Sequence, residues 1–174
     1  MARIAVLTVS DRAFRGEYED RGGPACEAWL RGVITSEVEI LRQITPDGRV
    51  EVAAALRDLA DTWGADLILA TGGTGPAPRD QTPEAMADVI TMELAGFGEA
   101  MRAANSRVVA TAILSRQGAG VRGKTLIITL PGSPNAISTS LEAIFAAVPY
   151  CLDLIGAARI ETDPAVIKAH RPKT

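Results

Sequence analysis

Short apolar runs that stop at polar or glycine-rich loops recur along the chain. Residues 4–9, 66–71 and 125–130 are continuous runs rich in Val, Ile and Leu. Runs of this length and composition are typical of strands buried on both faces of a sheet. A weaker run covers residues 38–44. The pattern therefore predicts four strands.

Between these runs the apolar positions change to helical spacing. Residues 52–63 place apolar side chains on one helical face and charged side chains on the other. Similar covering helices are predicted over residues 25–33, 84–90 and 135–155, and Pro149 should kink or divide the last of them. Strands that alternate with helices predict a three-layer α/β/α fold, with a mainly parallel sheet covered on both faces.

Composition indicates one soluble domain. The chain has 174 residues, of which 47% are hydrophobic and 22% charged, and we expect residues 1–174 to form a single domain with a short polar tail from about residue 163. The first apolar run is too short to span a membrane and no cleavage signal follows it, so we expect a cytoplasmic protein. The formal net charge of −3 argues against nucleic acid as a partner, and no membrane partner is expected.

Cysteine and histidine contribute little candidate chemistry. Cys26 and Cys151 each lie inside an apolar helical pattern, which indicates buried thiols rather than a disulfide or a metal site. The single histidine, His170, lies in the polar end of the chain and is expected to be solvated. Trp29 and Trp63 fall on apolar helical faces and are expected in the core. Carboxylates, hydroxyls, basic side chains and backbone amides remain as candidate catalytic groups.

A glycine-rich loop follows the second long apolar run. Residues 71–75 read Thr-Gly-Gly-Thr-Gly, where missing side chains allow backbone N–H groups to approach an anion. Thr71 and Thr74 add hydroxyl groups. Thr82 and Pro83 then predict the N-cap and first residue of a helix. The spacing matches neither a P-loop nor a dinucleotide fingerprint, and a tight connecting turn is the alternative interpretation.

Other strand ends carry polar loops of the same kind. Ser10, Asp11 and Arg12 follow the first run, residues 45–48 with Asp47 follow the weaker one, and residues 130–135 follow the last. Ligands of parallel sheets bind beyond the carboxyl ends of the strands, so these loops are expected to form one site. Asp47 and Asp80 each have a structural explanation, as a helix cap and as an acidic group near a helix start. Together they could instead hold Mg²⁺ beside an anion-binding loop.

Four further polar residues have two interpretations each. Arg122 and Lys124, before the last strand, could neutralise phosphate charge or could be solvated basic side chains. Ser115 and Ser133 could donate hydrogen bonds to a ligand, although serine is also common in loops.

The order of these motifs resembles the molybdopterin adenylyltransferase family. The motifs are Thr-Gly-Gly-Thr-Gly-Pro at 71–76, Pro-Arg-Asp-Gln-Thr-Pro-Glu-Ala at 78–85, Ala-Ile-Leu-Ser-Arg at 112–116, Gly-Val-Arg-Gly at 120–123 and Leu-Pro-Gly-Ser-Pro-Asn at 130–135. This family contains the bacterial Mog proteins, is related to MoaB, and includes the G domains of gephyrin and of plant molybdenum-insertion proteins. The resemblance covers nearly the whole chain. It implies the molybdopterin-binding fold of the Mog proteins.

The resemblance also implies an activity and a set of site residues. The reaction transfers AMP from Mg²⁺-ATP to the terminal phosphate of molybdopterin and releases pyrophosphate, in molybdenum cofactor biosynthesis. Asp47 and Asp80 correspond to the catalytic aspartates, with Mg²⁺ as cofactor. The residues that match the family's molybdopterin and nucleotide pocket are Ser10, Asp11, Asp20, Thr71, Gly72, Gly73, Thr74, Gly75, Ser115, Pro131, Gly132, Ser133 and Pro134.

Quaternary structure and alternatives follow from the same resemblance. A homotrimer is implied, and the product could pass to a molybdenum-insertion protein. One alternative is a nucleotide pyrophosphatase that resembles the related domain of competence-damage proteins, although those proteins differ after Thr-Gly-Gly. The other is a molybdopterin-binding carrier or scaffold without catalytic activity, against which the presence of both Asp47 and Asp80 argues.

Overall fold

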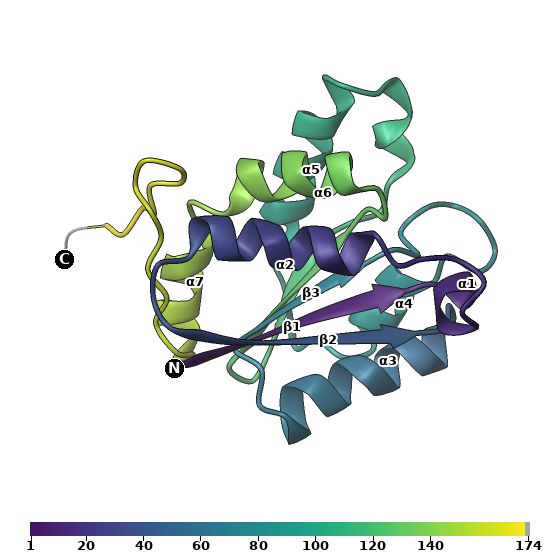
Figure 1. Ribbon diagram of the computed structural model, residues 1–174, viewed down its shortest axis with the longest axis horizontal. Coiled ribbons are helices and arrows are strands. Elements are labelled where there is room, and N and C mark those ends of the chain that lie inside the picture. The colour runs from purple at the N-terminus through teal and green to yellow at the C-terminus, as the bar shows by residue number, and fades with distance from the viewer. Residues whose placement is uncertain (173–174) are drawn as a thin grey trace.

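The computed structural model describes residues 1–172 and contains one six-stranded sheet with helices on both faces (Figure 1). The strands are β1 (Ala2–Val9), β2 (Val38–Thr45), β3 (Leu67–Thr71), β4 (Met92–Glu93), β5 (Ala119–Arg122) and β6 (Thr125–Leu130). The helices are α1 (Asp11–Phe14), α2 (Gly22–Val33), α3 (Arg49–Arg57), α4 (Thr82–Ala87), α5 (Ala95–Ser106), α6 (Pro134–Ile144) and α7 (Val148–Ile155). A π-helical turn over Asp58–Thr62 and a 3₁₀ helix over Ala110–Leu114 complete the elements.

The sheet is parallel at its centre and antiparallel at one side. The strand order is β2-β1-β3-β6-β5-β4. Strand β1 pairs in parallel with β2 and β3, and β3 pairs in parallel with β6. Strand β5 runs antiparallel to β6, and β4 antiparallel to β5. The predicted mainly parallel α/β architecture is confirmed.

Alternate side chains of the central strands supply two separate cores. Ile4 and Val6 belong to the core beneath α2 and α6, whereas Ala5 and Leu7 belong to the core beneath α3 and α4. The same alternation holds in β3 and β6, because successive strand side chains point to opposite faces. In Figure 1, α2 and α6 lie above the strands and α3 lies below them. Burial on both faces explains why these strands read as continuous apolar runs.

The four predicted strands agree with β1, β2, β3 and β6 to within two residues at each end. The predicted division of the helix over 135–155 is also confirmed, but it precedes Pro149. Helix α6 ends at Ile144 and α7 begins at Val148, so Pro149 lies in the first turn of α7. Proline is tolerated there because the first N–H groups of a helix have no intrahelical acceptor.

No single helix in residues 1–172 is long and apolar enough to cross a membrane. Helices α6 and α7 pass that test only as a pair, and their axes are bent by 65° at the break between them. Both contribute to the core above the sheet, through residues such as Leu141 and Leu152.

Cys26 is fully buried between α2 and the sheet, as expected. Burial raises the pKa of its thiol to about 12, and the charge of nearby Asp20 acts in the same direction. Because the thiolate is the reactive form, we expect Cys26 of the folded protein to resist alkylation at pH 8. Mass spectrometry after a timed exposure to iodoacetamide measures this, and rapid labelling without denaturant would contradict the burial. Cys151 is only partly buried, so the expectation of two buried thiols holds for Cys26 alone. Trp29 and Trp63 are partly buried and pack against the two cores, and His170 is exposed, as expected.

Candidate active site

The carboxyl ends of β1 and β3 lie next to each other, at the point where the order in which the chain adds strands to the sheet changes side. From β1 the chain passes to β2 on one side and later to β3 on the other, and such a switch point opens a crevice between the two loops that leave it. Backbone hydrogen bonds join each loop to the end of a neighbouring strand: Ser10 N donates to Thr45 O, at the end of β2, at 3.0 Å, and Gly72 N donates to Leu130 O, at the end of β6, at 3.1 Å. Residues of the loops after β1, β3 and β6 line one pocket. The predicted convergence of the strand-end loops is therefore observed.

The glycine-rich loop leaves β3 with a backbone that favours glycine. Gly72 and Gly73 have φ angles of 104° and 63°, which side chains disfavour. The N–H groups of Gly73, Thr74 and Gly75 donate to no acceptor within residues 1–172, although buried or partly buried N–H groups normally have one. Three consecutive donors are thus available to an anionic ligand.

Thr82 holds this loop against α4, in a role different from the predicted one. The N-cap of α4 is Gln81, so the prediction of Thr82 as N-cap is wrong. The Thr82 hydroxyl is buried and donates to Gly72 O at 2.9 Å, while Thr82 N donates to Gly73 O at 3.1 Å. Its hydroxyl is therefore used to fix the carbonyl side of the loop, which leaves the N–H side for ligand.

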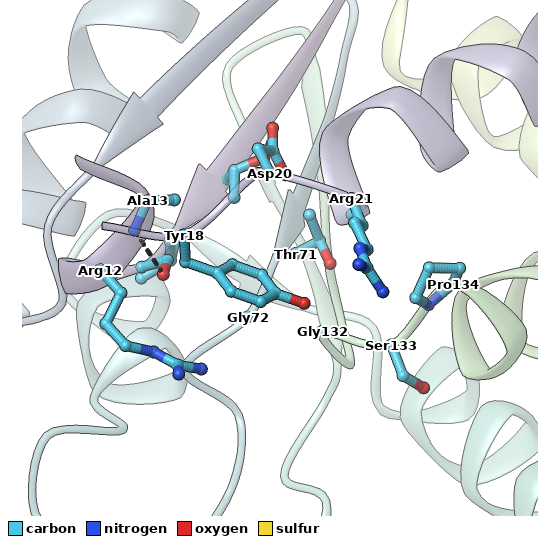
Figure 2. Close-up of a pocket in the computed structure, with 14 residues that line it drawn as sticks. Arg12, Ala13, Tyr18, Asp20, Arg21, Thr71, Gly72, Gly132, Ser133 and Pro134 are labelled. Atoms are coloured by element: carbon cyan, nitrogen blue, oxygen red, sulfur yellow. Dashed lines mark hydrogen bonds between the residues drawn. The ribbon is translucent and has the colours of Figure 1, made fainter. Parts of the chain in front are cut away.

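Two pockets border the loop. The first has a volume of about 420 Å³ and lies in the crevice between β1 and β3 (Figure 2). Its lining includes Ser10, Asp20, Thr71, Gly72, Gly132, Ser133 and Pro134 among the predicted residues, together with Arg12, Tyr18 and Arg21. The second, of about 300 Å³, is lined by Thr74, Gly75, Ser115, Pro131 and Ser133 among the predicted residues, and by Asn105 and Gln117. Ser133 borders both pockets, so the two volumes are neighbours.

Asp47 lies in the loop after β2 and is fixed by the loop after β1. Its Oδ2 accepts from Asp11 N at 2.7 Å, and its own N–H donates to Asp11 Oδ1 at 3.1 Å. Gly48, not Asp47, is the N-cap of α3 and no side chain caps that helix, so the helix-cap interpretation is wrong. Arg79 donates to both Asp11 Oδ1, at 2.9 Å, and Asp47 O, at 2.7 Å. This hydrogen bond and charge from Arg79 hold the pKa of Asp11 below its usual value.

Asp80 ends the loop that begins at Gly75, and Arg116 clamps that loop. The Arg116 Nη2 donates to Gly75 O at 3.0 Å and to Asp80 O at 2.5 Å, and its Nη1 pairs with Glu84. Burial raises the pKa of Glu84, but the hydrogen bond and charge of Arg116 outweigh it and the net pKa is lowered. The Asp80 carboxylate accepts only from Ala77 N, at 3.3 Å, within the described residues.

Both aspartate side chains lie directly against the glycine-rich loop. A Cβ placed on Gly73 would lie 3.3 Å from Asp47 Oδ1, and one placed on Gly75 would lie 2.7 Å from Asp80 Oδ2. Neither carboxylate forms an ion pair with a basic side chain in the part of the chain that the structure describes. Charged oxygens and free amide donors therefore occur side by side, an arrangement suited to a phosphate ligand and a hard cation.

Replacement of Gly75 by alanine should reduce activity without unfolding the protein. The new methyl group would meet Asp80 Oδ2 at 2.7 Å, which is too close for a real Cβ, so the carboxylate must move. Displacements of about 1 Å in a catalytic group cost about 100-fold in rate. Steady-state kinetics measure the loss. Gly96→Ala is the matched control, because nothing lies within 4 Å of its Cβ position, and an equal loss in both variants would refute a role for the Gly75–Asp80 contact.

Ser115 lies between the glycine-rich loop and Gln117, a residue that the sequence analysis did not identify. Its hydroxyl lies 3.4 Å from Thr74 Oγ1 and donates to Gln117 Oε1 at 2.9 Å. The Gln117 Nε2 is buried and has no acceptor among residues 1–172. Tyr18, Arg21 and Gln117 were missed as pocket residues, and Arg12 was noted only as part of the polar strand-end loop over residues 10–12. Each lies within a few residues of a recognised motif, and this proximity was the only signal available for them.

Arg122 and Lys124 do not lie at this site. Arg122 pairs with Thr125 at the start of β6, and its Nη2 forms an ion pair with Asp61 at 2.6 Å. Lys124 lies in the turn between β5 and β6, with its Cε 3.8 Å from the Cβ position of Gly156. Because β6 is parallel to β1 and β3, its first residues lie at the edge of the sheet opposite the glycine-rich loop. Their predicted role in binding phosphate is therefore corrected.

The family model described as "Probable molybdopterin binding domain" matches residues 5–150. The chain belongs to this family. Within it, the chain is 46% identical to a molybdopterin adenylyltransferase of Helicobacter pylori over 98% of this chain and 97% of the relative. It is 42% identical to the Escherichia coli K12 protein of the same name, over 99% of this chain and 94% of the relative.

Solved structures of molybdopterin biosynthesis proteins share the fold. The MoaB molybdopterin biosynthesis enzyme of Thermus thermophilus superposes with a TM-score of 0.80 at 45% identity, covering 89% of this chain and 96% of that chain. The match supports the molybdopterin-binding fold that the motifs imply. The family model spans residues 5–150, and the residues that line both pockets lie within that range.

Proposed function

We propose that this protein is a molybdopterin adenylyltransferase, which transfers AMP from ATP to the terminal phosphate of molybdopterin and releases pyrophosphate. The observation that carries the proposal is the glycine-rich loop with three free N–H groups and the carboxylates of Asp47 and Asp80 against it. The names of the relatives from H. pylori and E. coli support the same activity. The enzyme therefore acts in molybdenum cofactor biosynthesis.

The chemistry requires positioning more than proton transfer. An oxygen of the pterin phosphate attacks the α-phosphorus of ATP, a new P–O bond forms, and the bond to the pyrophosphate oxygen breaks. A phosphate nucleophile is already ionised at neutral pH, so no general base is needed. The N–H groups of Gly73, Thr74 and Gly75 can hydrogen-bond phosphate oxygens and stabilise their charge. Two neighbouring pockets of about 420 and 300 Å³ fit a reaction that needs two substrates side by side.

Asp47 and Asp80 are the residues that would hold Mg²⁺. Within residues 1–172 no three His, Cys, Asp or Glu side chains gather as a metal cage, and Mg²⁺ commonly uses one or two carboxylates together with water and substrate phosphates. The Asp47 Oδ1 accepts no hydrogen bond from a described residue, and Asp80 accepts only one weak bond. When bound, the ion would offset charge on the phosphate oxygens.

We further propose a homotrimer in the cytoplasm that passes its product to a molybdenum-insertion protein. Exposed apolar side chains support self-association, because they gather on one short stretch after α5. They are Val108, Val109, Ile113 and Leu114. Multi-angle light scattering would measure the mass, and a monomer at micromolar concentration would exclude the trimer.

The proposed activity is tested by incubating the purified protein with molybdopterin, ATP and Mg²⁺ and analysing the pterin by mass spectrometry. We expect a product heavier than molybdopterin by one adenylyl group, together with pyrophosphate. AMP and pyrophosphate without a modified pterin would instead indicate the nucleotide pyrophosphatase. Bound but unmodified molybdopterin would indicate the carrier.

A further inference from the structure

Two arginines flank the ring of Tyr18 at the rim of the first pocket. The Arg12 guanidinium carbon lies 4.8 Å from the centre of the Tyr18 ring, and that of Arg21 lies 5.9 Å from it. Figure 2 shows the ring between the two side chains, with Gly72 and Ser133 nearby. Both distances are typical of cation–π contacts. The three side chains form one unit at the mouth of the crevice between β1 and β3.

Neither guanidinium group forms an ion pair in the described chain, although the charge of Arg12 helps to lower the pKa of nearby Glu17. Arg12 and Arg21 form no ion pair and no side-chain hydrogen bond within residues 1–172. Arginines beside the same site behave differently, since Arg79 pairs with Asp11 and Arg116 pairs with Glu84. The contrast is notable in a protein whose net charge is −3, where acidic partners are more numerous than basic groups.

The carboxylate that shares this pocket is already occupied. Asp20 Oδ1 accepts from Gly23 N at 3.0 Å, and Oδ2 accepts from Thr8 Oγ1 at 2.9 Å. These bonds tie the segment with Tyr18 to β1 and to the start of α2. Asp20 therefore positions the segment, and the N–H edges of Arg12 and Arg21 remain available to a ligand.

We propose that Arg12 and Arg21, spaced by the ring of Tyr18, bind phosphate groups of a substrate at the mouth of the first pocket. Guanidinium groups bind phosphate through paired N–H donors, and a ring contact occupies the face of a guanidinium while its N–H edge stays free. The phosphate could belong to the triphosphate of ATP or to the phosphate ester of molybdopterin. This inference rests on the proposed adenylyl transfer for the identity of the two ligands.

The test measures the dissociation constants of ATP and of molybdopterin separately, by isothermal titration calorimetry. We expect Arg12→Gln and Arg21→Gln each to weaken one of the two ligands by about 10- to 100-fold, the range of one lost charged hydrogen bond. The weakened arm identifies the source of the phosphate. Arg31→Gln is the matched control, because Arg31 lies near the far end of α2 and pairs with Glu27; its binding constants should match wild type.

Tyr18 is a positioning residue. Its variants distinguish the role of its ring, which spaces the two arginines, from any hydrogen bond of its hydroxyl. Tyr18→Phe keeps the ring and should bind like wild type, whereas Tyr18→Leu should weaken the same ligand as the arginine variants. Circular dichroism confirms that each variant is folded. Binding of both ligands within twofold of wild type in Arg12→Gln and Arg21→Gln would overturn the inference. If the wild-type protein still made the adenylyl product in that case, the proposed function would stand and only the role of the two arginines would be refuted.

Discussion

Asp80→Asn should lower the rate of adenylyl-molybdopterin formation by about 100- to 1,000-fold, the cost of removing one preorganised electrostatic group. The substitution keeps the shape of the side chain but removes the charge that lies against Gly75. The clamp on the loop survives, because Arg116 binds the Asp80 carbonyl rather than its carboxylate. Single-turnover kinetics with saturating substrates measure the effect.

Asp61→Asn is the control for Asp80→Asn. Asp61 is also a carboxylate, but it pairs with Arg122 at the opposite edge of the sheet. We expect its rate to equal that of wild type. An Asp80→Asn enzyme with more than a third of the wild-type rate would remove Asp80 from the catalytic machinery.

Asp47→Asn should also lose activity, with a different signature. The remaining side-chain oxygen can still accept from Asp11 N, so the loop after β2 keeps its contact with the loop after β1. The loss of charge should raise the Mg²⁺ concentration needed for half-maximal rate, because carboxylates are the protein ligands that Mg²⁺ prefers. A Mg²⁺ titration at fixed ATP measures the shift.

The control for Asp47→Asn is a variant that keeps the Asp47 carboxylate and removes a hydrogen bond to the Asp47 backbone. Arg79→Gln abolishes the hydrogen bond to Asp47 O and the ion pair with Asp11. We expect it to slow catalysis while the Mg²⁺ requirement stays at the wild-type value. If Asp47→Asn left the Mg²⁺ dependence unchanged at reduced rate, Asp47 would be a structural residue only.

The sequence predicted the elements whose signal is local. Residues 66–71 and 125–130 are apolar on both faces of the sheet, and both appear as β3 and β6. Helix α5 was missed, since its start contains Gly96 and Gly98, which lower helical propensity. Strands β4 and β5 were missed because they are short, and tertiary pairing rather than an apolar pattern forms them.

The positions of candidate residues that follow parallel strands could be predicted from the sequence. The predicted position of Arg122 and Lys124 was wrong. Asp47, Asp80 and the loop over 71–75 follow parallel strands, whose carboxyl ends meet at one edge. Arg122 looked equivalent because it also adjoins a strand. Arg122 and Lys124 precede β6, and because β6 is parallel to β3 its first residues lie at the opposite edge. Their place before a strand rather than after one already argued against a role at this site.

The pocket contacts of Tyr18 and Gln117 could not be predicted for a related reason. Tyr18 reaches the first pocket because Asp20 accepts a hydrogen bond from Thr8, twelve residues earlier in the chain, and so ties the segment with Tyr18 to β1. Gln117 lines the second pocket, where the Ser115 hydroxyl donates to its side-chain oxygen. Both placements depend on side-chain hydrogen bonds between segments, which no periodicity encodes.

The central claim is that the pterin phosphate attacks the α-phosphorus of ATP at the glycine-rich loop. Two parallel reactions, one with ATP labelled at the α-phosphorus and one with ATP labelled at the γ-phosphorus, test it most directly. We predict that the α label appears in the pterin product in amounts equal to the pyrophosphate released, and that the γ label appears only in pyrophosphate. A γ label on the pterin, or an α label found only in free AMP, would contradict the account.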